Sequence, residues 1–211
     1  MDGFIIPTGL NNQANAYEEL YREYLEDRIL VFNDEVSDNM VEDIVLYILK
    51  WNKEDINLPV EARKPIKIYM SSVGGDTFVS QNVVDVIVAS KTPVIGIGLS
   101  LVASACYHCY LACHERIAFK NSIFLQHDGS VSISNSAKKV KDTVAFFESG
   151  DMRTKEFVLS RTKMTEEFYD QYYDSELYMY ADRAKELGVV DKIIGIDCTL
   201  EEVLSWGVFY G

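Results

Sequence analysis

The sequence is poor in basic residues, and this lack limits the partners that the protein can bind. Its 20 lysine and arginine residues stand against 33 aspartate and glutamate residues, which gives a formal net charge of −13 at pH 7. A surface that follows a phosphate backbone needs clustered positive charge. We therefore expect no binding to nucleic acid. An acidic face toward a protein partner fits the charge, although charge alone does not identify that partner.

Long apolar runs and export signals are also absent. No stretch approaches the roughly 18 apolar residues of a membrane-spanning helix. The N-terminus, MDGFIIPTGLNNQ, has no basic segment followed by an apolar one, as a secretory signal would. The sequence has four cysteines, which we expect to be reduced thiols in a chain without an export signal. These features predict a cytoplasmic protein with no membrane partner.

Metal and cofactor signatures are weak. Cys106, Cys109 and Cys113 follow a helical spacing in an apolar run, whereas a zinc site needs four converging ligands, usually from more than one element. This spacing favours buried, small apolar side chains over ligands. The sequence contains no G-x-G-x-x-G segment and no Walker motif. We therefore expect neither a metal nor a cofactor.

The residues that are present predict an α/β protein. The chain of 211 residues is 48% hydrophobic, which suits one domain with a real core. Residues 1–16 read as an N-terminal arm and residues 17–211 as a single domain. Apolar strand-like segments alternate with helical ones, a pattern typical of layered α/β folds. The expected elements are strands near 66–72, 93–99, 122–126 and 190–196, helices near 78–90, after 104 and at 137–162, and an extended edge at 130–134.

Two short segments between these elements are candidates for chemistry. SSVGGD, residues 71–76, places two glycines between a strand and a helix. There they either form an ordinary turn or point N–H groups into a cavity. Ser104 lies between two alanines at the start of a helical run. A serine in this place either caps the helix or acts as a nucleophile, because the helix N-terminus stabilises an oxyanion beside it.

A base and an acid are available further along the chain. His127 directly follows the predicted strand 122–126, where its imidazole could reach a neighbouring loop. The alternative to a catalytic base is that His127 has only a structural role. The other two histidines, His108 and His114, lie within the apolar helical run. Asp174 and Glu176 are possible acids in the aromatic segment FYDQYYDSELYMY.

The order of these segments resembles the Clp protease proteolytic subunit (ClpP) family. SSVGGD resembles the family's Ser-Pro-Gly-Gly turn, with Val73 in place of proline, and SLVASA resembles the Gly-x-Ala-Ser segment around the nucleophile, with Ser100 where glycine is common. NSIFLQHDG and ADRAKELGVVD resemble the histidine segment and the closing segment. The resemblance covers about residues 28–195. It implies a ClpP/crotonase-like ββα superhelical fold with a protruding handle, made of a strand and a long helix.

The register of the resemblance leaves two questions open. Matching from the Gly-Gly turn places Ser104 on the family's serine, whereas counting back from His127 without a gap places Val102 there and gives a dead site. ClpP-like proteins of the phage type have the shorter spacing, which favours Ser104. Counting back from GVVD places Glu176 on the family's aspartate, with Asp174 as the alternative acid.

The resemblance implies a serine endopeptidase that hydrolyses unfolded polypeptides through an acyl-enzyme. Its catalytic residues would be Ser104, His127 and Glu176, and the N–H groups of Gly75 and Ala105 would form the oxyanion hole. The expected assembly is two stacked heptameric rings, a tetradecamer, fed by a Clp-type AAA+ ATPase. Because the chain has no Walker motif, any use of ATP would belong to that partner.

The resemblance also assigns accessory segments and leaves other functions open. The N-terminal arm would line an axial pore, and residues 129–134 would pair with a substrate strand. The alternatives are a catalytically inactive ClpP-like ring subunit, a crotonase-type acyl-CoA enzyme, and a capsid-maturation peptidase of the phage type.

Overall fold

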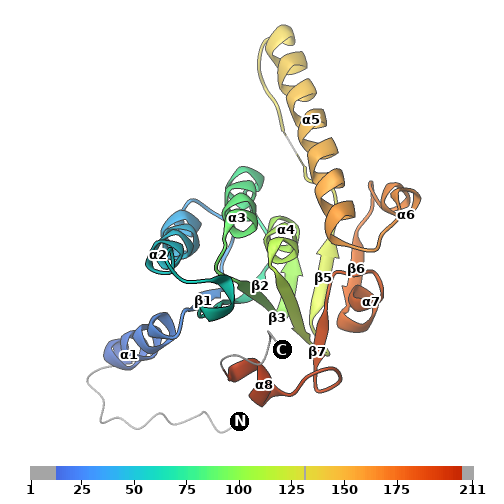
Figure 1. Cartoon of the computed structure of the whole chain (residues 1–211). Coiled ribbons are helices and arrows are strands. Elements are labelled where there is room, and N and C mark those ends of the chain that lie inside the picture. The colour runs from blue at the N-terminus through green and yellow to red at the C-terminus, as the bar shows by residue number, and fades with distance from the viewer. Residues whose placement is uncertain (1–12, 131, 206–211) are drawn as a thin grey trace, which may run out of the picture.

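A seven-stranded sheet forms the centre of the computed structural model, which describes residues 13–130 and 132–205 (Figure 1). Its central strands are rich in β-branched residues that are buried on both faces, as in parallel sheets covered by helices. The strands are β1 (Ile29–Phe32), β2 (Ile66–Ser72), β3 (Val94–Ala103), β4 (Glu115–Phe119), β5 (Ile123–Gln126), β6 (Leu177–Tyr180) and β7 (Lys192–Ile194).

The strand β3 divides the sheet into two branches. Its first half, Ile95–Gly98, pairs in parallel with β4, and its second half, Leu101–Ala103, pairs in parallel with β5. The main path is β1-β2-β3-β4-β7, and β6 joins β5 antiparallel. Because β2, β3 and β5 are parallel, their carboxyl ends meet at one edge, which is where open α/β sheets hold their ligands.

Helices cover the sheet on both faces. The main core lies between the sheet and α2, α3 and α4, which lie on the upper side in Figure 1. On the other face, Val203 and Cys198 of the C-terminal region pack on Ile95, Ile97 and Ile117. The helical segments are α1 (Gln13–Glu26), η1 (Val41–Val45), α2 (Leu46–Glu54), η2 (Val60–Ala62), α3 (Thr77–Ala89), α4 (Ala105–Ala112), α5 (Ala137–Arg161), α6 (Glu166–Gln171), α7 (Ala181–Glu186) and α8 (Leu200–Leu204).

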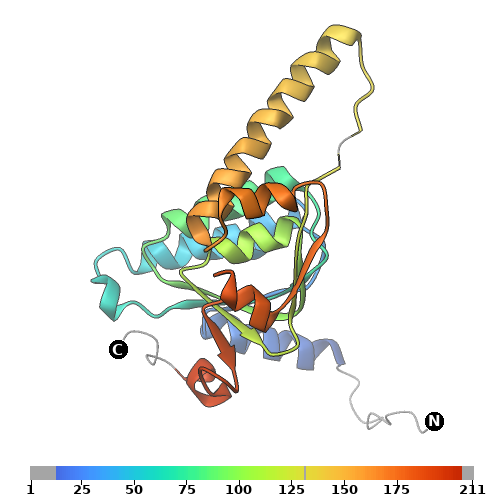
Figure 2. The ribbon, with the colours of Figure 1, turned by 90° about the vertical axis from the view of Figure 1, so that its right-hand side faces the viewer.

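The long helix α5 protrudes from the body as a handle (Figures 1 and 2). Val158, near its C-terminal end, is the one buried residue of this helix, so only the base of the handle joins the core. The Arg161 side chain fixes that base by donating hydrogen bonds to the backbone oxygens of Leu111, Ala112 and Cys113 at the end of α4. The expected helix of the handle is therefore present.

Two parts of the expected architecture differ. No strand forms within 127–130 and 132–136, so among the described residues the expected extended edge at 130–134 is an irregular segment. At the N-terminus, α1 begins at Gln13, inside the arm expected for residues 1–16; the rest of that arm lies outside the described residues. Within the described part of the chain, no helix is both long and apolar enough to cross a bilayer.

Candidate active site

Ser104 lies in a strained turn between β3 and α4. Its backbone has φ 54° and ψ −125°, and its neighbours Ala103 and Ala105 end the strand and begin the helix. An L-residue in such a conformation costs about 1–3 kcal/mol, and this strain is found mainly at functional sites. A serine on a sharp strand-to-helix turn is also how hydrolases expose a nucleophile. The backbone geometry favours a functional role for Ser104.

The two alternatives for this position do not fit the structure. The Ser104 side chain makes no capping hydrogen bond to α4, although the residue is at the N-cap position. Val102 is fully buried in β3 between Ser72 and Phe124, where its side chain belongs to the core. A valine in that environment presents nothing to a substrate, so the register that makes Val102 the family's serine is disfavoured.

The Gly-Gly turn lies directly against Ser104. A Cβ atom at Gly74 would lie 2.6 Å from Ser104 Cβ and 2.9 Å from the backbone oxygen of Ala103, and Gly74 has φ 101°. Both the space and the conformation therefore demand glycine. Asp76 fixes the other end of the turn, since its side chain accepts hydrogen bonds from the first N–H groups of α3.

The glycine turn and the start of α4 each hold a backbone N–H group that has no hydrogen-bond partner among the described residues. The N–H of Gly74 donates to Ser72 Oγ at 3.1 Å, and the N–H of Asp76 donates to the backbone oxygen of Val36 at 2.8 Å. Among the described residues, neither the N–H of Gly75 nor that of Ala105, the first residue of α4, donates a hydrogen bond. These are the two groups that the sequence predicts for an oxyanion hole.

His127 and Glu176 face each other across two paired strands. Gln126 pairs with Leu177 in the antiparallel β5–β6 ladder, so the residues just outside this pair lie side by side. His127 Nδ1 is 3.9 Å from Glu176 Oε1, and the two side chains are 28% and 58% exposed. This distance is too long for a hydrogen bond, although such contacts tighten when substrate binds. Asp174 lies exposed in the preceding turn, with no ion pair to His127.

A backbone hydrogen bond connects the serine to the histidine strand. The N–H of Ser104 donates to the backbone oxygen of Leu125 at 3.0 Å, two residues before His127. The sheet thus brings the serine turn next to the end of β5. Ser104 Oγ makes no hydrogen bond to His127 in this structure. The fold brings Ser104, His127, Glu176 and the glycine turn to one edge and leaves Asp174 outside.

Two side chains near this edge were not assigned a role from the sequence. The Tyr178 hydroxyl hydrogen-bonds to Glu176, which raises the pKa of the tyrosine. The two residues are two positions apart and therefore share one side of a strand, a spacing that could have indicated the contact. His108 lies one helical turn after Ser104. Burial, and then the proximity of His127, lowers the pKa of His108 to about 4.

The depressed pKa of His108 makes the protein less stable in mild acid. The ordinary histidine pKa is 6.5. Between pH 6.5 and about pH 4, His108 therefore binds a proton in the unfolded chain but stays neutral in the folded chain. His108 therefore does not reduce the free energy of unfolding above about pH 6.5, and it reduces that free energy increasingly as the pH drops toward 4. Between pH 7 and pH 5 we expect His108 to account for about 1–2 kcal/mol of lost unfolding free energy. Urea unfolding at pH 7 and at pH 5 measures the lost unfolding free energy. In the His108→Gln variant this loss should be smaller by about 1–2 kcal/mol. An equal loss in the variant and the wild type would contradict the role of His108.

The remaining histidine and the cysteines have structural environments. His114 Nδ1 accepts a hydrogen bond from the N–H of Val94 at 2.9 Å. Cys106, Cys109 and Cys113 are fully buried, and burial raises the pKa of each thiol, that of Cys113 to about 12. Thiols with raised pKa values are poor metal ligands. Among residues 13–130 and 132–205, no group of histidine, cysteine or acidic side chains could hold a metal.

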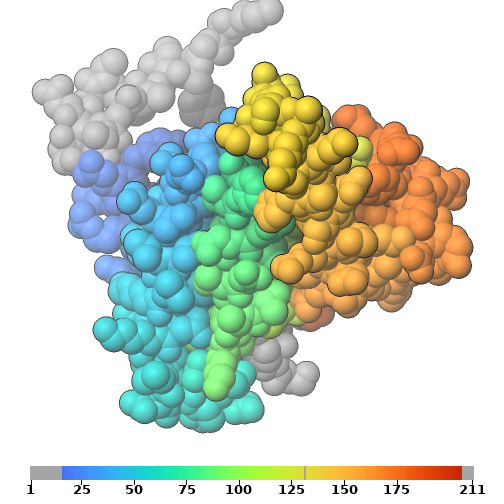
Figure 3. Space-filling model, turned by 90° about the horizontal axis from the view of Figure 1, so that it is seen from above, coloured from blue at the N-terminus to red at the C-terminus, as the bar shows by residue number. Residues whose placement is uncertain are grey.

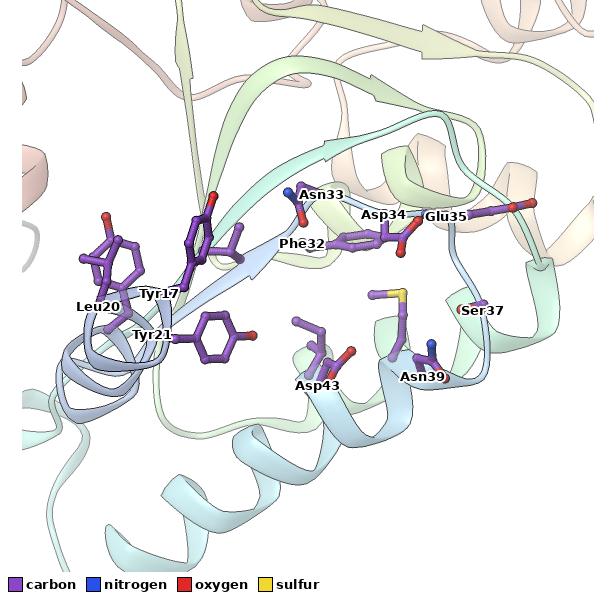
Figure 4. Close-up of a pocket in the computed structure, with 14 residues that line it drawn as sticks. Tyr17, Leu20, Tyr21, Phe32, Asn33, Asp34, Glu35, Ser37, Asn39 and Asp43 are labelled. Atoms are coloured by element: carbon purple, nitrogen blue, oxygen red, sulfur yellow. Dashed lines mark hydrogen bonds between the residues drawn. The ribbon is translucent and has the colours of Figure 1, made fainter. Parts of the chain in front are cut away.

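A large cavity lies elsewhere on the molecule. It has a volume of about 440 Å³ and lies between α1 and the segment that joins β1 to η1. Figure 4 shows Tyr17 and Tyr21 of α1 on one side of it, and Asn39 and Asp43 on the other. None of Ser104, His127 and Glu176 lines this cavity. Its size therefore gives no reason to move the candidate site away from the glycine turn.

Known structures share this fold. A mutant of ClpP1 from Listeria monocytogenes is similar with a TM-score of 0.70; the likeness covers 83% of this chain and 95% of that chain at 21% sequence identity. At this identity the likeness shows the fold alone. The expected ClpP-type α/β fold is thus confirmed.

Curated relatives and a family model agree with the structural likeness. The ATP-dependent Clp protease proteolytic subunit 2 of Treponema denticola is 27% identical over 184 residues, which cover 86% of this chain and 89% of that protein. The protein of the same name from Treponema pallidum is 28% identical over 178 residues, which cover 82% and 85%. The family model described as Clp protease matches residues 12–197. Since that match spans most of the sequence, the chain belongs to the Clp protease family.

Proposed function

We propose that this chain is a serine-type endopeptidase subunit that hydrolyses unfolded polypeptides through an acyl-enzyme. One observation carries the proposal: Ser104 is held in a strained turn with no capping bond, beside the Gly74–Gly75 bend, and its N–H is hydrogen-bonded to Leu125 in the strand that leads to His127. A serine that only packed or capped would not need this conformation. The membership of a protease family is in accord with this chemistry.

In the proposed mechanism the proton of Ser104 moves to His127. Glu176 faces Nδ1 of the imidazole, which leaves Nε2 for the serine. As Ser104 Oγ attacks the scissile carbonyl carbon, Nε2 takes the hydroxyl proton and later delivers it to the leaving amine. Water then attacks the resulting ester, with His127 again as the base, and releases the acid product and Ser104. Glu176 stabilises the charged imidazolium and orients its ring.

The two unpartnered N–H groups would stabilise the tetrahedral intermediate. Ala105 directly follows Ser104 at the start of α4, and Gly75 directly follows Gly74, the residue of the glycine turn that lies against Ser104. Negative charge on the carbonyl oxygen would be met by both N–H groups and by the positive end of the helix dipole. Each such donor is worth roughly 3 kcal/mol of transition-state stabilisation.

The proposed assembly is two stacked heptameric rings that enclose the active sites and receive substrate from a Clp-type AAA+ ATPase. The curated relatives are named as ATP-dependent proteolytic subunits, and this chain contains no Walker motif. The handle also carries exposed apolar side chains, Val144, Phe146 and Met152, which an interface between copies would cover.

Hydrolysis of short peptides tests the proposed activity without the partner. A fluorogenic peptide is small enough to reach an enclosed site by diffusion, whereas a folded protein is not. We expect the purified chain to cleave the peptide and an unfolded casein slowly, and to leave a folded protein intact. Complete absence of peptide cleavage, with the chain folded and assembled, would contradict the proposal.

The catalytically inactive ring subunit is the second candidate, and two observations favour it. Nδ1 of His127 is 3.9 Å from Glu176, and Ser104 Oγ is not hydrogen-bonded to His127. An inactive subunit would assemble into rings and cleave nothing. The acyl-CoA alternative leaves Ser104 and His127 without roles, and we expect no binding of coenzyme A in a calorimetric titration.

The identity of the acid can be tested with matched variants. Glu176→Gln keeps the size of the side chain but cannot stabilise the imidazolium, so we expect kcat for peptide hydrolysis to fall about 100-fold. The effect should be smaller than for a fully buried acid because Glu176 is largely exposed. Asp174→Asn, in the same segment, should change kcat less than twofold. The reverse order of effects would assign the acid to Asp174.

A further inference from the structure

A second cavity lies beside the candidate site, at the junction of α3, α4 and the handle. Its volume is about 290 Å³. Seen from above in Figure 3, the green surface of α3 borders the yellow and orange surface of α5, and the cavity lies between these helices. The residues around it are Thr77, Ser80, Gln81, Val84, Asp85, His108, Arg153, Thr154 and Phe157.

Two residues that line the cavity lie within one helical turn of the candidate site along the chain. Thr77 follows the glycine turn by two residues, and His108 follows Ser104 by one turn of α4. A substrate whose carbonyl carbon lies at Ser104 Oγ must direct the neighbouring side chain away from the turn. The cavity between α3, α4 and α5 is positioned to receive that side chain.

Four of the polar side chains around this cavity have no hydrogen-bond or ion-pair partner within the described part of the chain. His108 makes no hydrogen bond or ion pair; its contact is an edge-on approach of the Tyr107 ring, at 5.8 Å between ring centroids. No hydrogen bond satisfies the amide of Gln81. At the rim, Arg153 and Asp85 carry opposite charges and form no ion pair with any described residue.

We propose that this cavity selects substrates with a carboxamide side chain, glutamine or asparagine, immediately before the scissile bond; this rests on the proposed peptidase function. A neutral imidazole offers one donor and one acceptor, and the Gln81 amide offers both as well. A carboxamide matches this pattern. An apolar side chain would displace water and leave His108 and Gln81 unsatisfied, which polar sites penalise strongly.

The charges at the rim favour neither sign of ionised side chain. A carboxylate or an ammonium would meet both Asp85 and Arg153, one attractive and one repulsive, and each would lose hydration on entering the cavity. Burial keeps His108 neutral near pH 7, so it adds no charge that would favour a carboxylate. The apolar walls, Val84 and Phe157, suit the methylene groups of a glutamine.

The test compares three fluorogenic peptides that differ only in the residue before the scissile bond: glutamine, glutamate or methionine. Methionine has the length of glutamine without the amide. With the full chain at pH 7 we expect kcat/KM for the glutamine peptide to exceed that for the methionine peptide about tenfold, and the glutamate peptide to be the slowest. A methionine peptide cleaved as fast as the glutamine peptide would overturn the proposal.

Three variants connect this preference to the cavity. His108→Leu should abolish the preference for glutamine over methionine, and Gln81→Leu, on the exposed side of α3, should weaken it several-fold. Asn82→Leu makes the same change one residue away, outside the cavity lining, and should leave the preference unchanged. If His108→Leu fails to fold, Gln81→Leu decides, and a ratio unaffected by that change overturns the assignment.

A binding experiment separates this proposal from the proposed function. In the Ser104→Ala chain, acetyl-Ala-Ala-Gln and acetyl-Ala-Ala-Met are titrated while the imidazole NMR signals of the three histidines are followed. We expect the glutamine peptide alone to shift the His108 signal. If peptide hydrolysis is absent but this selective shift occurs, the peptidase function fails and the binding preference stands. Equal shifts with both peptides, or none, overturn the carboxamide preference while leaving hydrolysis by Ser104 untouched.

Discussion

Replacing Ser104 by alanine is expected to lower kcat/KM for peptide hydrolysis by about 10⁴-fold or more, to the level that substrate binding and the N–H groups alone provide. Without the Ser104 hydroxyl no acyl-enzyme can form, and a water molecule would have to attack the peptide bond directly. The loss should appear with every peptide, because it concerns bond formation and not recognition. A progress curve with the fluorogenic peptide, followed over hours at high enzyme concentration, measures it.

The stability of two Ser104 variants provides the control. Alanine keeps the strain of φ 54°, so the unfolding free energy of Ser104→Ala should stay within about 0.5 kcal/mol of the wild type. Glycine adopts this conformation readily, so Ser104→Gly should raise the unfolding free energy by about 1 kcal/mol while also being inactive. A gain in stability that accompanies the loss of activity would show that the strain serves function. A Ser104→Ala protein that still hydrolyses peptides would contradict the assignment.

Replacing Gly74 by alanine is expected to abolish hydrolysis and to lower the unfolding free energy by roughly 2–4 kcal/mol. The new Cβ would lie 2.6 Å from Ser104 Cβ and 2.9 Å from the backbone oxygen of Ala103, both closer than atoms can approach. The residue would also be forced to keep φ 101°. Relief requires the turn to move away from Ser104, which would take the N–H of Gly75 out of position. Chemical denaturation and peptide hydrolysis measure the two effects.

Gly150 is the matched control for this substitution. It lies within α5, and a Cβ there would meet nothing within 4 Å. Gly150→Ala should therefore raise the unfolding free energy by up to about 1 kcal/mol, because alanine favours helix more than glycine does, and should leave peptide hydrolysis unchanged. If both glycine variants behaved alike, the special role of Gly74 beside Ser104 would be wrong.

The sequence predicted the fold, and it supplied the candidate site residues, because these signals are local. Glycines between a strand and a helix, a serine between alanines and a histidine at a strand end are readable from residue order. The pairing of Gln126 with Leu177 is not, although it decides that Glu176 and not Asp174 faces His127. Likewise, the spacing of residues cannot show that Gly74 touches Ser104 Cβ, because that contact joins segments 30 positions apart in the chain.

The sequence misjudged the segment after His127 for a physical reason. The alternation in residues 130–134 is typical of an extended edge, but a strand requires a partner that supplies backbone hydrogen bonds. None is present in the described part of the chain, and the segment is irregular. His108 does lie in the predicted apolar helical run, α4. Its position on a cavity depends on how α5 packs on α4, which the local pattern does not contain.

The most direct test of the proposed catalytic serine is reaction with a fluorophosphonate, which phosphonylates only an activated hydroxyl, followed by peptide mapping of the adduct. We predict a single modified residue, Ser104, with labelling lost in Ser104→Ala and strongly slowed in His127→Ala. Labelling at another serine, or a folded wild-type chain that never reacts, would contradict the account and leave the architectural role of the subunit.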